Sequence, residues 1–168
     1  MLKSPSKIRK TLSSLSETFQ LRAFAMAKIP LLYWCLPSVV EVTEERCEIR
    51  IPWIRRTKNH LGSMYFGVLC VGADCAGGLI AMNHIKKSGK KVSLIFKDFH
   101  ADFLKRAEGG DVHFICEQGP EIRELVEKTL SSSERQELPV TITAVVPKVN
   151  PTDPVARFVL TLSLKKRD

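Results

Sequence analysis

Apolar and polar residues alternate in several stretches of the chain, and this period of two residues predicts β-strands with one buried face. The clearest example covers residues 38–53, which fit two antiparallel strands that turn at Glu44 and Glu45. The apolar face of this segment consists of Cys47, Ile49, Ile51 and Trp53. Four more strands are predicted at 90–102, 112–116, 140–146 and 156–164. A sheet of about six strands is therefore expected, which is a common size.

The strand predicted at 90–102 changes its apolar phase part-way along. Val92, Leu94 and Phe96 share one face, after which Phe99 and the next alternate residues take over. This change of phase indicates a β-bulge near residues 97 and 98. The last two strands are expected to form a hairpin, joined by a loop that holds Pro147, Pro151 and Pro154.

Three other segments carry apolar residues at helical spacing. The first follows a start signal of Ser4 and Pro5, and its apolar positions are Ile8, Leu12, Leu15 and Phe19. The second runs from Met64 to about Ile85 and is apolar nearly all round, which predicts a buried helix. The third is a short amphipathic helix opened by Gly119-Pro120, with an apolar side of Ile122, Leu125, Val126 and Leu130.

The elements follow one another as helix, two strands, long helix, two strands, short helix and two strands. Hairpin connections would build an antiparallel sheet around the apolar helix, which is an α+β arrangement. The chain has 168 residues, no internal repeat and no linker long enough to divide it, so a single domain over 1–168 is expected.

The net charge of +8 favours anionic partners such as nucleic acid, a membrane surface or a phosphate-bearing ligand. Much of this charge lies at the two ends of the chain, at Lys3, Lys7, Arg9, Lys10, Lys165, Lys166 and Arg167. No aromatic-rich basic motif or helix-turn-helix pattern accompanies it, so a nucleic-acid partner is not expected.

The five cysteines, at positions 35, 47, 70, 75 and 116, form no CxxC pair and no metal-ligand spacing with a histidine. They fit reduced, buried side chains in a reducing compartment, so we expect a cytoplasmic protein without a metal site. No apolar secretory signal follows the basic N-terminus. Residues 59–85 are long enough to cross a membrane, but polar residues at both ends and Asp74 near the centre argue against a transmembrane span.

Asp74 is the only formally charged residue between Lys58 and Lys86. A single acid on an apolar helix is costly to bury, which makes it a candidate functional group. The alternative is a structural aspartate that is satisfied by the backbone or by a hydroxyl group across a dimer interface.

The segment from Asn59 to Asp74 resembles a known motif. In the phenylacetyl-CoA thioesterase branch of the hotdog fold, Asn-x-x-Gly-x-x-His-Gly-Gly is followed by an acid seven residues later, and Asn59, Gly62, Gly67 and Asp74 match these places. The segment NHLGSMYFG is also similar to an uncharacterised family of hotdog proteins described as thioesterases, and residues 102–111 resemble the strand and turn that follow. Tyr65 stands where that branch has histidine, and Phe66 replaces the first of the paired glycines.

The resemblance covers about 38–166 as a hotdog core and leaves 1–30 as an N-terminal helical extension. It implies an acyl-CoA thioesterase that is a homodimer or a tetramer, with coenzyme A as part of the substrate and no separate cofactor. In this reading Asp74 is the general base or nucleophile, and burial should raise its pKa towards the useful range. The helix start at Met64–Gly67 would hold an oxyanion through free N–H groups.

For several other residues, both a functional role and a purely structural role are possible. Asn59 and Tyr65 could orient the thioester carbonyl or a water, or they could only cap and pack, and Gly67 could admit a carbonyl or serve only packing. Gly62, Met64 and Phe66 are expected along the substrate path. The cations proposed for the coenzyme A phosphates are Lys97, Lys105 and Arg106.

Three other functions remain open beside hydrolysis. The first is a hotdog protein that binds acyl-CoA or an acyl chain without turning it over, suggested by the missing histidine. A hotdog dehydratase fits less well, because no histidine lies opposite the acid. A membrane-surface binder is suggested only by the net charge and the basic N-terminal helix.

Overall fold

The computed structural model describes residues 5–167, with side chains from residue 13 onwards. The helices are α1 (Pro5–Lys28), α2 (Pro30–Trp34), the 3-10 turn η1 (Arg55–Thr57), α3 (Phe66–Ser88) and α4 (Gly119–Leu130). The strands are β1 (Ser38–Val42), β2 (Cys47–Ile51), β3 (Val92–Phe103), β4 (Val112–Cys116), β5 (Gln136–Val146) and β6 (Asn150–Lys166).

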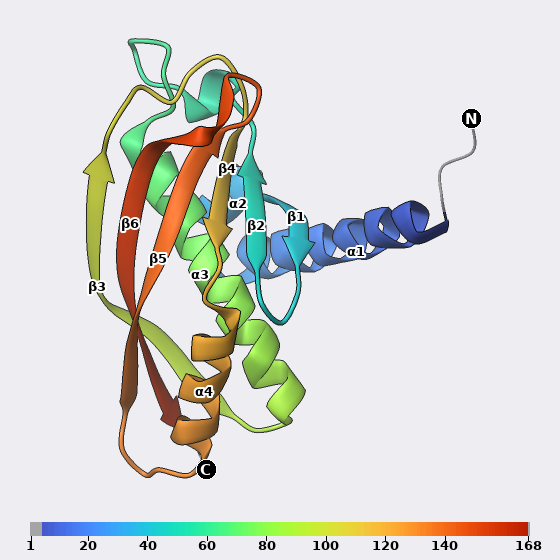
Figure 1. The fold of residues 1–168 in the computed structure, drawn as a ribbon, viewed down its shortest axis with the longest axis vertical. Coiled ribbons are helices and arrows are strands. Elements are labelled where there is room, and N and C mark those ends of the chain that lie inside the picture. Colours follow the sequence, from blue (N-terminus) through green and yellow to red (C-terminus); the bar gives the residue numbers. More distant parts are fainter. Residues whose placement is uncertain (1–4, 168) are drawn as a thin grey trace.

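The six strands form one sheet in the order β1-β2-β4-β5-β6-β3, and every neighbouring pair is antiparallel. The predicted antiparallel sheet of about six strands is confirmed. The expectation of hairpin connections throughout is wrong at one place, because β3 pairs with β6 at the far edge and not with β4. The chain therefore crosses the sheet between β3 and β4 (Figure 1).

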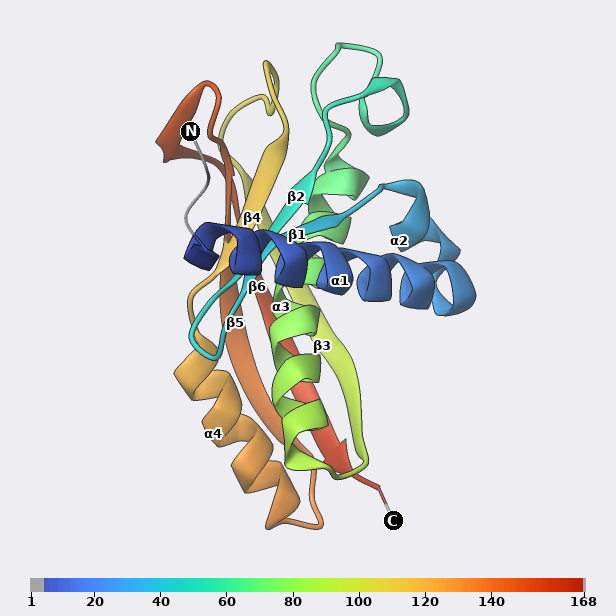
Figure 2. The ribbon, with the colours of Figure 1, turned by 90° about the vertical axis from the view of Figure 1, so that its right-hand side faces the viewer.

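The long helix α3 runs along one face of this sheet, as Figures 1 and 2 show. Its small residues face the strands directly: Gly72 lies against the ring of Phe114, and Gly77 lies against Val140 and Ile142. The apolar character of α3 is therefore explained by packing within one chain, as the hydrophobic effect requires for a helix that is apolar all round.

Three details of the strands bear on the sequence predictions. The register between β3 and β6 shifts between Phe96 and Phe99, which confirms the bulge. The proline-containing loop between the last two strands is shorter than expected, because β6 already begins at Asn150 and includes Pro151 and Pro154. The strand β2 ends at Ile51, so Trp53 lies beyond the strand whose apolar face it was expected to extend.

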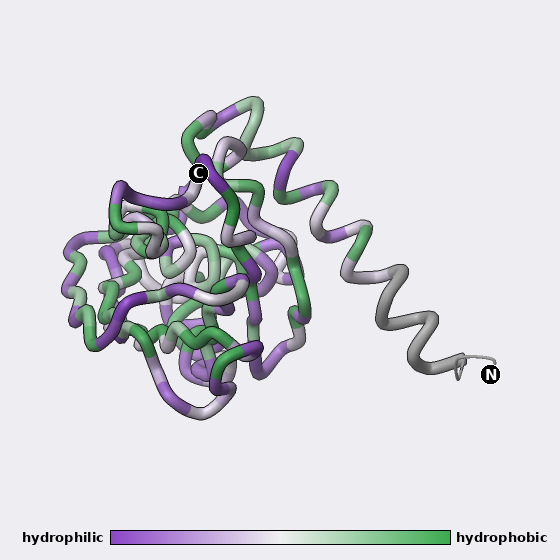
Figure 3. Tube along the Cα trace, turned by 90° about the horizontal axis from the view of Figure 1, so that it is seen from above, coloured by the Kyte–Doolittle hydropathy of each residue, from purple (hydrophilic) through white to green (hydrophobic). Residues whose placement is uncertain are grey.

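The helix α1 packs on the domain through a different face from the one predicted. Leu15 is 61% exposed and Phe19 is 74% exposed, whereas Leu21 and Ala25 are buried in the same core as α3. The side chains of Ile8 and Leu12 lie outside the described residues. Seen from above, the coloured part of α1 lies next to the domain at its C-terminal end and slants away from it towards the N-terminus (Figure 3).

Hydrogen bonds from Arg22 fix the position of α1. Its guanidinium donates to the carbonyls of Leu36 and Pro37 and to the hydroxyl of Ser38, at 3.2, 2.9 and 2.7 Å. These bonds join α1 to the segment that leads from α2 into β1. As a result α1 and α2 are held next to each other and next to α3 (Figure 2).

Candidate functional site

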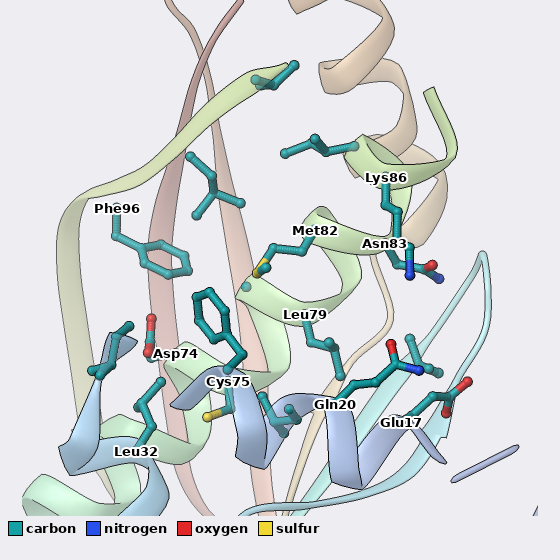
Figure 4. A pocket seen from close by; sticks show the side chains of 18 residues that line it. Glu17, Gln20, Leu32, Asp74, Cys75, Leu79, Met82, Asn83, Lys86 and Phe96 are labelled. Atoms are coloured by element: carbon teal, nitrogen blue, oxygen red, sulfur yellow. The ribbon is translucent and has the colours of Figure 1, made fainter. Parts of the chain in front are cut away.

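A cleft of about 680 Å³ lies between α3, β3 and the two N-terminal helices (Figure 4). A volume of this size falls in the range of about 300–1,000 Å³ that small-molecule sites occupy. The apolar side chains that line it are Leu21, Phe24, Ile29, Leu32, Val42, Leu79, Met82, Ile85, Val92, Leu94 and Phe96. A cleft lined in this way suits an apolar ligand.

Asp74 lies on the α3 side of this cleft. In Figure 4 its carboxylate points into the cleft beside Phe96 and Leu32. Within residues 13–167 no hydrogen bond or ion pair reaches this carboxylate. Burial raises the pKa of Asp74 above its ordinary value, because desolvation disfavours the charged form. A partly buried acid with free oxygens in an apolar cleft is the arrangement expected of a general base.

The opposite end of the cleft is polar. Glu17 and Gln20 of α1 face Asn83 and Lys86 of α3 there (Figure 4). The cleft therefore has an acid at one end, an apolar middle and a polar group of side chains at the other end.

The start of α3 offers backbone donors away from this cleft. The helix begins at Phe66, and the N–H groups of Val68 and Leu69 donate to the carbonyl of Tyr65 at 2.9 and 3.1 Å. Since the first N–H groups of a helix have no intrahelical acceptor, those of Phe66 and Gly67 remain available as donors. They also lie at the positive end of the helix dipole, which favours an anion.

The backbone N–H groups of Met64 and Tyr65 are both used within the fold. The N–H of Met64 donates to the carbonyl of Ala107 at 2.7 Å, and the side chain of Met64 is buried. The N–H of Tyr65 likewise donates to the carbonyl of Thr57 at 2.9 Å. Two of the four expected backbone donors are therefore already used within the fold.

The ring of Tyr65 lies directly over Gly67. A Cβ atom at position 67 would stand 2.7 Å from Cε1 of that ring, which is closer than carbon atoms approach. Gly67 is thus needed for the position of Tyr65, and the exposed Tyr65 can present its hydroxyl to a ligand at the helix start.

Asn59 and Gly62 shape the loop that precedes α3. The side-chain oxygen of Asn59 accepts a hydrogen bond from the N–H of Leu61 at 2.9 Å, and its amide donates to the hydroxyl of Ser63 at 3.0 Å. Gly62 has a φ of 85°, and its carbonyl accepts from the indole N–H of Trp53 at 3.0 Å. Both polar groups of the Asn59 amide are therefore engaged in the loop.

The helix start and Asp74 do not meet within one chain. Asp74 follows Phe66 by eight residues, 74 minus 66, in the same helix. At about 1.5 Å per residue the two are roughly 12 Å apart along the axis. One thioester carbonyl cannot contact both groups of the same protomer.

The three cations expected to hold phosphates do not converge on the cleft. Lys97 forms an ion pair with Glu137 at 2.6 Å, and Lys105 forms one with Asp153. Arg106 is exposed in the segment after β3. None of the three lines the cleft.

Two features of this region were not found from the sequence. The first is the wall of the cleft that α1 and α2 supply, since Leu21 and Ala25 were not part of the apolar set identified there. The second is a group of exposed rings at the start of α3 and on β3, here called the aromatic patch: Tyr65, Phe66, Phe99 and Phe103. The rings of Phe66 and Phe103 lie 6.2 Å apart. Phe66 and Phe103 are far apart in the sequence, so the sequence pattern did not indicate this contact.

Three further features of residues 13–167 concern metal binding, the cysteines and helices long enough to cross a membrane. No group of three His, Cys, Asp or Glu side chains in this part could hold a metal ion, and all five cysteines are free thiols. In the described part, α3 alone is long and apolar enough to cross a membrane, and 56% of its most apolar window is buried inside the domain. Its packing on the sheet accounts for that composition.

Comparison with known families gives one match. Residues 18–162 fit the model of a family described as a domain of unknown function, DUF4442. The chain belongs to the DUF4442 family. The matched range of this DUF4442 domain begins inside α1, so the second half of that helix, together with α2, is part of the family's unit. No curated protein sequence matches the chain.

Solved structures resemble the DUF4442 domain over nearly their whole length. A protein of unknown function from Chlorobaculum tepidum superposes with a TM-score of 0.77 at 12% identity, covering 92% of this chain and 97% of that one. A thioesterase family protein from Silicibacter pomeroyi gives 0.64 at 18% identity, with 89% and 99% covered. A thioesterase from Haemophilus influenzae gives 0.59 at 15% identity, with 84% and 86% covered.

At these identities the likeness establishes the fold alone. The DUF4442 domain has the hotdog fold of thioesterase-family proteins, as the motif around Asn59 and Asp74 suggested.

Proposed function

We propose that this protein hydrolyses acyl thioesters, with Asp74 as the general base or nucleophile. The observation that carries the proposal is the carboxylate of Asp74, which is partly buried, has a raised pKa and points unpaired into an apolar cleft. The thioesterases among the structural neighbours support the same reaction class.

In the general-base route a water molecule gives a proton to Asp74 as its oxygen bonds to the thioester carbonyl carbon. The carbonyl oxygen becomes an oxyanion, which two backbone N–H groups can stabilise. The tetrahedral intermediate then collapses, the carbon–sulfur bond breaks, and the leaving thiolate takes the proton from Asp74. The products are a carboxylic acid and a free thiol, so no cofactor is consumed.

The oxyanion donors are assigned to the N–H groups of Phe66 and Gly67 in a second protomer. This assignment follows from the separation of about 12 Å between Asp74 and the helix start in one chain. The aromatic patch supports it, because exposed aromatic clusters are typical of protein interfaces. The patch lies beside the free edge of β3, and an unpaired strand edge can add the same strand of another copy.

The substrate is proposed to be an acyl-CoA, with the homodimer as the smallest active unit. The positive net charge favours a ligand that carries phosphates. Arg106 remains the candidate for a phosphate contact, since Lys97 and Lys105 already have acidic partners. Five free cysteines, of which four are buried, fit the reducing conditions of the cytoplasm.

The test is release of free thiol from a series of acyl-CoA esters by wild-type protein and by Asp74→Asn. Loss of a general base should lower kcat by about 10²- to 10⁴-fold. Glu124→Gln is the matched control, because Glu124 is exposed on α4 and does not line the cleft. Thiol release at the wild-type rate by Asp74→Asn would exclude this mechanism.

A second candidate is a protein that binds acyl-CoA or an acyl chain without hydrolysing it. The observation that favours it is the engagement of both the oxygen and the nitrogen of the Asn59 amide in its own loop, which gives this side chain a structural role there. Saturable binding of acyl-CoA with no thiol release from any ester would select this candidate.

A further inference from the structure

The cleft follows one face of α3 for most of the helix. Asp74, Gly78, Met82 and Lys86 all line it, and residues four apart lie on the same side of a helix. The twelve steps from residue 74 to residue 86 span about 18 Å at about 1.5 Å per residue. The cleft is therefore much longer than the thioester group alone requires.

The width of the cleft is set at Gly78. A Cβ atom at this position would meet only the ring of Phe96, at 3.8 Å, so the missing side chain leaves open space next to Asp74. Phe96 of β3 and Leu32 of α2 flank this space in Figure 4. A slender group can pass between them, along the surface of α3.

Beyond Gly78 the lining is flexible and aliphatic. Leu79 and Met82 of α3, Leu94 and Val92 of β3 and Phe24 of α1 all line the cleft. Met82 adapts its shape to a ligand because it is unbranched. Apart from the thiol of Cys75, which is a weak hydrogen-bonding group, no polar side chain of α3 lines the cleft between Asp74 and Asn83. This middle section therefore offers mainly burial of apolar surface.

We infer that this cleft is the site of an unbranched aliphatic acyl chain, which runs from Asp74 along α3 towards Lys86 under the wall made by α1 and α2. An extended chain advances about 1.2 Å per bond, as a polypeptide does, so 18 Å holds roughly 12 to 16 carbons. The inference rests on the proposed function, because Asp74 marks the position of the thioester carbonyl. A short aryl-acyl group would leave most of the cleft empty.

The polar end fits the same occupant. Glu17, Gln20, Asn83 and Lys86 stand where the methyl end of a chain of this length would arrive. Burying a longer chain beyond this point would desolvate these groups without giving them partners, which is unfavourable. The cleft should therefore impose an upper limit on chain length.

The experiment measures binding of butanoyl-, octanoyl-, dodecanoyl- and hexadecanoyl-CoA below their micelle concentrations. Asp74→Asn protein is used so that the ligand is not consumed. Each buried methylene contributes about 0.8 kcal/mol, so affinity should rise roughly tenfold for every two methylenes added. The rise should stop near the chain length that fills the cleft.

Two blocking variants in the same background locate the chain. Gly78→Leu obstructs the cleft about 6 Å from Asp74, and Met82→Trp does so about 12 Å from it. Gly78→Leu should weaken octanoyl- and hexadecanoyl-CoA by at least about tenfold and leave butanoyl-CoA within about twofold. Met82→Trp should spare octanoyl-CoA and weaken only the longer esters. Glu124→Leu, which introduces a leucine at an exposed site on α4, is the control for Gly78→Leu.

The outcomes separate this inference from the proposed function. Affinity independent of chain length, or equal weakening of all esters by both variants, would overturn the acyl site even if thiol is released by the wild type. Loss of the dimer in Gly78→Leu would show that a second protomer fills the cleft and would also overturn it. Chain-dependent binding without thiol release would overturn hydrolysis and support the acyl site.

Discussion

The ring of Phe114 on β4 occupies the space that a side chain of residue 72 on α3 would need. A Cβ atom on Gly72 would stand 2.3 Å from two carbons of that ring. This contact brings α3 close to the centre of the sheet. It therefore helps to set the distance between the sheet and the part of α3 that carries Asp74. Gly78, six residues later, has no such close neighbour, because it faces the cleft.

The two glycines are therefore expected to respond in opposite ways to alanine. Gly72→Ala should lower the free energy of unfolding by about 1–3 kcal/mol through overpacking against Phe114. Gly78→Ala should raise it by up to about 1 kcal/mol, since alanine is the better helix former and its Cβ makes an ordinary contact with Phe96. Urea denaturation of both variants measures the difference. Equal effects would contradict the packing described for α3.

The raised pKa of Asp74 makes a prediction about stability and pH. Because its pKa is higher in the folded protein than in the unfolded chain, the native state binds more protons between the two values, and stability falls as pH rises through this window. The window begins at the ordinary aspartate pKa of about 3.9. Asp74→Asn lacks this titration, so its free energy of unfolding should increase relative to wild type as pH rises.

Chemical denaturation at a series of pH values tests this expectation. The difference between Asp74→Asn and wild type should be smallest in acid and should level off above the folded-state pKa. Glu124→Gln, a change at an exposed site outside the cleft, is measured alongside as the control. Parallel curves for Asp74→Asn and wild type would show that Asp74 is not buried as described.

The aromatic patch predicts how the protein assembles. Phe103→Glu places a charge beside Phe66, whose ring is 6.2 Å from that of Phe103, and should raise the dimer dissociation constant by at least about 30-fold, the effect of about 2 kcal/mol. Sedimentation velocity at a series of concentrations measures this constant. Val149→Glu, a similar change at an exposed site in the turn before β6, should not alter it.

Thiol release should fall together with the dimer in Phe103→Glu, because the oxyanion donors are assigned to the second protomer. A monomer with full activity would remove that assignment. A wild-type protein that stays monomeric at all concentrations would remove the proposed interface as well.

Asn59 gives a prediction that separates loop structure from catalysis. Removing its amide in Asn59→Ala should cost about 1–2 kcal/mol of stability, since the bonds to Leu61 and Ser63 are lost. The value of kcat/KM should change by less than about tenfold. A loss of activity as large as that of Asp74→Asn, with stability unchanged, would instead make Asn59 a catalytic residue.

Much of the fold could be predicted because local pattern and tertiary packing agree. The period of two in β4 and β5 and the phase change at Phe96 report directly which residues face the helix. The face of α1 could not be predicted in this way. Leu15 and Phe19 have the spacing of a buried stripe, yet the bonds of Arg22 to the segment after α2 turn the helix so that Leu21 and Ala25 are buried.

The same limit applies to the site. Asp74 could be singled out as a candidate because no other charged residue lies between Lys58 and Lys86, and burial of such a group has a cost wherever the helix packs. The ion pairs of Lys97 and Lys105 could not be predicted, since their partners Glu137 on β5 and Asp153 on β6 are distant in sequence and come close to them only in the folded sheet.

Sequence alone determined most elements of this protein, the single acid of its long apolar helix and its likeness to hotdog thioesterases, because these depend on residues that are neighbours along the chain. Tertiary structure decided the place of β3 at the sheet edge, the wall that α1 and α2 form opposite α3, and the distance between Asp74 and the start of its own helix. These features depend on contacts between residues far apart in the sequence, and the hydrophobic effect that drives such contacts has no direction of its own.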